Sequence, residues 1–94
     1  MIVSELKVYD QRYLVIRLNG NVESPVWDYK DGEQGKSFLI ESNQGFDTDL
    51  GEIVTINELL LNLPPNDTLC WEFSGEEIKG VVKEDRKEGI LYLN

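Results

Sequence analysis

The fold of this chain depends on one stretch, Thr55-Ile-Asn-Glu-Leu-Leu-Leu-Asn-Leu-Pro-Pro65. Thr55 and Glu58 fit a capping box, in which the threonine hydroxyl accepts from the third following amide and the glutamate reaches back. The leucines behind them are good helix formers, and the two prolines stop the run. The stretch therefore predicts a single helix of about two turns near residues 56–63.

A strand is expected directly after this helix. From Thr68 to Phe73 apolar and polar residues alternate, which is the period of a strand with one better-buried face. The pattern predicts that Trp71 and Phe73 lie in the core. Cys70, in the same run, is predicted to be a buried packing residue. Further strands are expected over residues 36–42, 78–83 and 90–93, and residues 52–55 are expected to form a short strand or a lead-in to the helix.

The amino-terminal segment has the pattern of a β-hairpin spanning residues 2–18. The residues from Ile2 to Tyr9 alternate in the strand period, and Asp10-Gln11 supplies a short turn into a second strand over residues 12–18. Asn19-Gly20-Asn21 closes that strand, because Asn and Gly both tolerate positive φ.

The segment after this turn, residues 22–35, carries no clear strand signal. Pro25 argues against a central strand position, because proline has no N–H to donate to a neighbouring strand. Asp31-Gly32 and Gly35 are typical of a loop. The aromatic residues Trp27 and Tyr29 are therefore expected to lie within an acidic loop.

Together these elements predict a mainly β protein forming a single domain over residues 1–94. The expected architecture is a small antiparallel sheet or an open barrel of five to six strands with one short helix near residues 56–63. An α+β roll is the alternative.

Charge is strongly segregated along the chain. The net charge is −9, but the segment from Asn21 to Glu77 holds thirteen acidic residues against two basic ones. Such a charge repels nucleic acid and anionic membranes and attracts basic surfaces. Three interpretations remain open: a solvated surface that favours solubility, a face complementary to a basic protein, and a face that imitates a nucleic-acid backbone.

Nothing in the sequence favours catalysis. There is no histidine, so the commonest acid/base and metal ligand is missing, and a Ser or Cys nucleophile would have no imidazole to activate it. Cys70 is the single cysteine, which excludes an internal disulfide. A domain of this size is expected to have little room for a cleft of ~300 Å³. We therefore predict a protein that is not an enzyme and has no cofactor.

Two acidic stretches superficially resemble calcium loops, Asp28–Glu33 and Asp47–Glu52. An EF-hand needs acidic or amide side chains at positions 1, 3 and 5 with Gly at position 6. Aligning Gly32 or Gly51 as position 6 puts Trp27 or Phe46 at position 1. Neither stretch fits, so solvated loops are expected and no metal site is predicted.

The segregated charge instead suggests a protein-binding surface in the acidic segment, formed by Trp27, Asp28, Tyr29, Asp31, Glu33, Asp47, Asp49 and Glu52. The expected partner is a basic protein, such as a nuclease toxin blocked by an immunity protein or a host defence nuclease blocked by a phage inhibitor. No direct binding of nucleic acid or membrane is expected. Without a signal peptide or a long apolar run, a cytoplasmic location is expected.

The alternative function is that of a structural or assembly subunit. In that case an exposed sheet edge, either residues 90–93 or residues 2–9, would carry contacts between copies of the chain.

Overall fold

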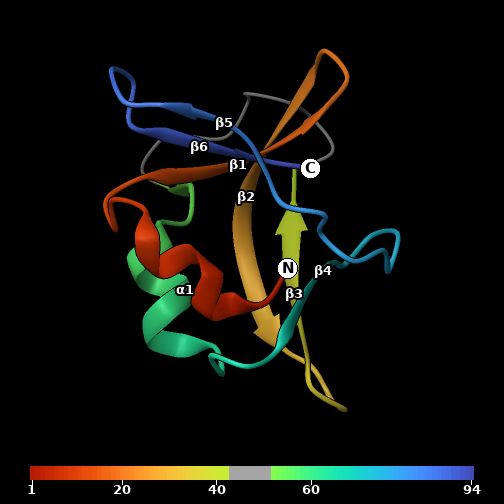
Figure 1. Ribbon diagram of the computed structural model, residues 1–94. Coiled ribbons are helices and arrows are strands. Elements are labelled where there is room, and N and C mark those ends of the chain that lie inside the picture. Colours follow the sequence, from red (N-terminus) through yellow and green to blue (C-terminus); the bar gives the residue numbers. More distant parts are fainter. Residues whose placement is uncertain (43–51) are drawn as a thin grey trace.

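The computed structural model describes residues 1–42 and 52–94, which form one six-stranded sheet with a short helix (Figure 1). The strand order is β4-β3-β2-β1-β6-β5, and the sheet does not close into a barrel. In chain order the elements are η1 (a 3₁₀ helix, Val3–Val8), β1 (Leu14–Asn19), β2 (Val22–Asp31), β3 (Lys36–Glu41), α1 (Ile56–Asn62), β4 (Thr68–Trp71), β5 (Val81–Asp85) and β6 (Ile90–Leu93). The predicted mainly β class is confirmed.

The sheet is mixed, so the expected antiparallel pairing holds for three of its five strand pairs. β1–β2, β2–β3 and β5–β6 pair antiparallel, whereas β3–β4 and β1–β6 pair parallel. Parallel neighbours need a long crossover connection. The chain between β3 and β4 includes α1, which allows it to return to the end of the sheet where β3 begins.

Helix α1 begins as its sequence predicts. The Glu58 amide donates to Thr55 Oγ1 at 3.2 Å, and the Thr55 amide donates to Glu58 Oε1 at 3.5 Å. α1 and η1 lie side by side on one side of the sheet (Figure 1). The core beneath them joins residues of the helices and the strands, including Val3, Leu6, Val15, Leu39, Ile56, Leu59, Leu69, Trp71, Leu91 and Leu93.

The predicted hairpin over residues 2–18 was wrong in its first half, because Val3–Val8 forms the 3₁₀ helix η1. Val3 and Leu6 are both fully buried, since residues three apart share one side of a 3₁₀ helix. Val8, which the alternation placed with Leu6, is 82% exposed. Long-range bonds hold the segment: the Val3 amide donates to the Asp67 carbonyl at 3.0 Å.

Residues 22–31 form a ten-residue strand in the interior of the sheet, so Pro25 did not exclude a strand. The Pro25 carbonyl accepts from the Ser42 amide at 2.8 Å. In an antiparallel ladder the nitrogen and carbonyl of one residue face the same neighbour. The missing N–H of Pro25 therefore falls at the end of the β2–β3 ladder, just past the last residue of β3.

Strand β4 is confirmed but shorter than expected. Cys70 is buried as predicted, and so is Trp71. Phe73, which was predicted to be in the core, is 78% exposed. The strand ends at Trp71, where the Gly75 amide donates to the Trp71 carbonyl at 2.8 Å and Gly75 adopts φ 75°. The turn rotates the chain out of the strand alternation before Phe73 is reached.

The other predicted strands agree with the observed strand positions to different extents. Residues 36–42 and 90–93 correspond closely to β3 and β6. The strand expected at residues 78–83 lies later, as β5. Of the strand expected at residues 52–55, the structure shows a single bridge between Leu14 and Thr55. The turn at Asn19-Gly20-Asn21 connects β1 to β2, with Gly20 at φ 63°.

Candidate functional site

Trp27 lies at an irregularity in the middle of β2. The pairing of β2 with β3 shifts register between Val26, opposite Glu41, and Asp28, opposite Ile40. Trp27 is therefore an extra residue, and such bulges redirect side chains. Trp27 is 49% exposed and Asp28 is also exposed. An interior strand thus exposes an aromatic ring and a carboxylate from two consecutive residues, Trp27 and Asp28.

Glu52 lies close to this bulge. The Val54 amide donates to the Val26 carbonyl at 2.8 Å, which places the chain after residue 51 directly beside the start of the bulge. Glu52 is exposed, two residues before that contact. The fold therefore brings together two parts of the predicted surface that are far apart in sequence, Trp27 with Asp28 and Glu52.

Asp31 and Glu33 lie at the far end of β2, where it turns into β3. Both are exposed. At ~3.3 Å per residue, Asp31 lies about 13 Å along the strand from Trp27. That separation fits within a protein interface of ordinary size, which covers about 800 Å² on each partner. The predicted residues therefore form two groups, one at the bulge and one at the hairpin.

The hairpin between β2 and β3 has a defined shape. The Gly32 amide donates to the Lys36 carbonyl at 2.8 Å, and Gln34 and Gly35 adopt positive φ. A Cβ on Gly32 would lie 2.5 Å from the Phe38 ring and 2.7 Å from the Lys36 carbonyl oxygen. Glycine is therefore required at position 32, and the acidic residues around it are held in place by backbone geometry.

Tyr29 points away from this surface. Its ring packs against the core, and its hydroxyl accepts a hydrogen bond from Asn62 Nδ2 of α1 at 3.0 Å. Its neighbour Lys30 forms an ion pair with Glu72 at 2.8 Å, and the Lys30 ammonium lies 5.7 Å from the centre of the Phe38 ring. Tyr29 thus contributes to packing between the sheet and α1. Asp47 and Asp49, the remaining predicted residues, lie outside the described residues.

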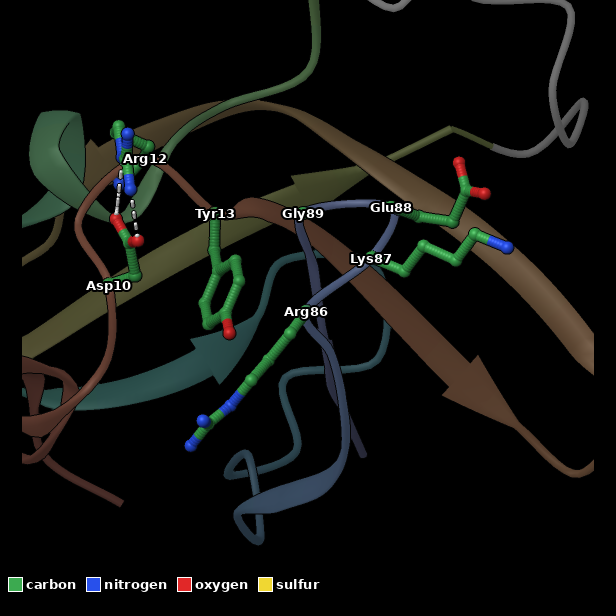
Figure 2. A pocket seen from close by; sticks show the side chains of 7 residues that line it. All are labelled: Asp10, Arg12, Tyr13, Arg86, Lys87, Glu88 and Gly89. Carbon is green, nitrogen blue, oxygen red and sulfur yellow. Dashed lines mark hydrogen bonds and ion pairs between the residues drawn. The ribbon is translucent and has the colours of Figure 1, made fainter.

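The structure also contains a surface pocket that sequence reasoning missed, with a volume of about 300 Å³ (Figure 2). Its walls come from the turn before β1 and the turn between β5 and β6, and comprise Asp10, Arg12, Tyr13, Arg86, Lys87, Glu88 and Gly89. The expectation that the domain has little room for a cleft of ~300 Å³ was therefore wrong. The one signal for it was the basic residues near both ends of the chain.

Carboxylates accompany the cations of this pocket. Asp10 accepts from Arg12 Nε at 3.1 Å and Nη2 at 2.8 Å, and this contact lowers the pKa of Asp10 to about 2. Glu84 accepts from the Tyr13 hydroxyl at 2.8 Å and from Arg86 Nε at 3.2 Å. Loss of solvent, followed by the Glu84 carboxylate, raises the pKa of Tyr13. These pairings leave little net charge to attract an anionic ligand.

Neither predicted edge segment is an edge of the sheet. Ile90–Leu93 is β6, paired on both sides, and residues 3–8 are helical. The outer side of β4 is covered, because the Leu69 amide donates to the Met1 carbonyl at 2.9 Å and the Trp71 amide to the Glu76 carbonyl at 2.8 Å. β5 is the other edge strand, and it carries charged residues and a register shift, features that discourage strand addition.

Among residues 1–42 and 52–94, no group of three or more acidic or cysteine side chains is placed to hold a metal ion. The helices in the same residues are too short and too polar to cross a bilayer. Comparison with protein-family models, curated proteins and solved structures finds no match to this chain.

Proposed function

We propose that this chain binds a basic protein surface and blocks it, without catalysing a reaction. The observation that carries the proposal is the half-exposed Trp27 at the bulge of an interior strand, beside Asp28. Because the ring is half exposed, folding gains only part of the free energy that full burial of a tryptophan would provide. Exposed tryptophans of this kind are common anchors of protein interfaces.

Charge defines the chemistry of the partner. Asp28 and Glu52 lie at the bulge, Asp31 and Glu33 at the hairpin, and the whole chain carries −9. The nearby cation Lys30 is already paired with Glu72. A cationic surface would supply the missing countercharges and would be drawn in over long range. The substrate groove of a nuclease is such a surface, because it is built to hold a phosphate backbone.

Surface plasmon resonance tests this proposal on immobilised basic proteins, beginning with the products of genes adjacent to the one encoding this chain. Asp28→Lys should slow association and flatten its dependence on salt. Trp27→Ala should instead speed dissociation, by about 2 kcal/mol for an anchor residue. Circular dichroism confirms that each variant is folded.

Glu88→Lys is the matched control, because it makes the same charge change in the turn between β5 and β6, outside the proposed surface. The Glu88 side chain is exposed and points away from Tyr13 (Figure 2). The control should leave dissociation unchanged and reduce association less than Asp28→Lys does. If the three variants behave alike, or if no basic protein binds, the proposed surface is wrong and the acidic segment serves solubility.

A further inference from the structure

A buried serine lies between two carboxyl groups at the base of the β2–β3 hairpin. Ser37 of β3 is fully buried, and its hydroxyl donates to Asp67 Oδ2 at 2.9 Å. Asp67 precedes β4 and is only 9% exposed, which is unusual for a carboxylate without a cation. Its carbonyl also accepts from the Val3 amide at 3.0 Å, so the same residue holds η1 in place.

Asp31 approaches this pair from the opposite strand. It is directly opposite Ser37 in the β2–β3 ladder, so both side chains lie on the same face with Cβ atoms about 5 Å apart. Ser37 is opposite Asp31 and bonded to Asp67, so the two carboxyl groups belong to one cluster around its hydroxyl. Two ionised carboxylates accept hydrogen bonds only, so a hydrogen bond between Asp31 and Asp67 needs a proton on one of them.

We propose that Asp31 and Asp67 form a proton-sharing carboxyl pair that makes the attachment of the β2–β3 hairpin to the loop before β4 sensitive to pH. The proton held between them bridges β2 to this loop, and through the loop to the amino terminus. Its loss places two negative charges next to each other. This inference does not depend on the proposed function.

The charged groups around the pair leave it without a counterion. Lys30 and Lys36 flank Asp31 and Ser37 in their strands, so they lie on the other face of the sheet, and Lys30 is paired with Glu72. From η1, the carboxylate of Glu5 accepts from the Ile2 amide. Among the described residues, no ion pair to Asp31 or Asp67 is formed.

The effect of the Asp31 pKa on the pH dependence of stability has a definite direction. Loss of solvent, then the hydrogen bond and the charge of Asp67, raise the pKa of Asp31. A carboxyl whose pKa is higher in the folded than in the unfolded protein stabilises the fold while protonated. This contribution is complete below the ordinary pKa of aspartate and is lost as the pH rises through the higher folded value. The pair therefore favours folding in acid and opposes it at neutral pH.

Two measurements on the full chain test the proposal. Carbon-detected NMR of the Asp31 carboxyl group across pH should show Asp31 titrating above the ordinary range of aspartate. Asp67→Asn should return Asp31 to a single step nearer that range, because the neighbouring charge is gone. Titration of Asp31 within the ordinary range of aspartate, or a titration of Asp31 that Asp67→Asn leaves unchanged, would overturn the proposal.

Thermal unfolding supplies the second measurement. Asp31→Asn keeps a hydrogen-bond donor toward Asp67 and should raise the melting temperature at neutral pH, with the gain vanishing in acid. Glu33→Gln, two residues after Asp31 in the hairpin, removes the same charge without touching the pair and is the matched control. A gain no larger than that of the control, or a gain that does not depend on pH, would contradict the carboxyl pair.

Discussion

The two tryptophans of this chain lie in opposite kinds of surroundings. Trp71 is 1% exposed, and the Arg17 guanidinium carbon lies 4.7 Å from the centre of its ring, with Arg17 also paired to Glu41. Trp27 is 49% exposed at a bulge, next to Asp28. In the interior, the Arg17 guanidinium stacks on the ring and pairs with Glu41, while Arg17 Nε and the Trp71 indole nitrogen have no hydrogen-bond partner among the described residues. At the bulge, the Trp27 ring and the Asp28 carboxylate both remain open to solvent, an arrangement that folding does not require.

The largest expected difference between the two regions is in stability. Trp71→Ala should lower the free energy of unfolding by about 4 kcal/mol, through lost burial and the cavity left behind. Trp27→Ala should lower it clearly less, by about 1–2 kcal/mol, because half of the ring is already in solvent. Urea denaturation followed by circular dichroism measures both. Equal losses would show that Trp27 is a structural residue and would remove the basis for treating the bulge as a binding site.

The second largest loss of stability is expected from substitutions in the Arg17–Glu41 ion pair beside Trp71. The Arg17 and Glu41 side chains are only 15% and 9% exposed, so Glu41→Gln leaves a buried cation without its counterion. We expect a loss of about 3 kcal/mol. The double variant Arg17→Met with Glu41→Leu removes both charges and should recover most of that loss, because no buried charge remains. If Glu41→Gln costs no more than Asp28→Asn, the interior pair contributes no more than a surface carboxylate.

Fluorescence quenching compares the solvent accessibility of Trp27 and Trp71 in the folded protein. Acrylamide should quench the emission of Trp27 readily and that of Trp71 hardly at all, because only the first is accessible. The variant Trp27→Phe should lose most of the quenching, whereas Trp71→Phe should retain it. Comparable quenching of the two single-tryptophan proteins would contradict the assigned exposures. A neutral quencher is needed, since a protein of net charge −9 repels iodide.

The smallest effect is expected at Phe73, an aromatic residue close to Trp71 in sequence but outside the core. Phe73→Ser should change the free energy of unfolding by about 0.5 kcal/mol or less, because the side chain is 78% exposed. Urea denaturation again provides the measurement. A loss comparable to that of Trp71→Ala would mean that β4 continues to Phe73, as the sequence alternation predicted.

The sequence predicted part of the candidate site. The acidic segment and its loop-like aromatics identified Trp27 and Asp28, both of which are exposed. Tyr29 was assigned to the same surface because periodicity in an irregular segment gives no inward or outward direction. The structure directs it toward Asn62 through a hydrogen bond. The pocket near Arg12 and Arg86 escaped prediction because its walls are more than seventy residues apart in sequence.

The sequence alone determined the features that arise from interactions between close neighbours. The capping box of Thr55 and Glu58, the stop at Pro64-Pro65 and the turn at Gly20 depend on side chains and backbone a few residues apart. Strand periodicity likewise located β3 and β6 well, because each alternates over a short run. Such interactions hold wherever the segment lies in the fold.

Only the tertiary structure decided the rest. Val3–Val8 alternates like a strand but is helical, because Val3 and Leu6 are buried together and the amide of Val3 finds the carbonyl of Asp67. Pro25 enters an interior strand, because its missing donor falls at the end of a ladder. In each case a distant partner supplies the deciding hydrogen bond or buried contact, and local propensity is too weak to oppose it.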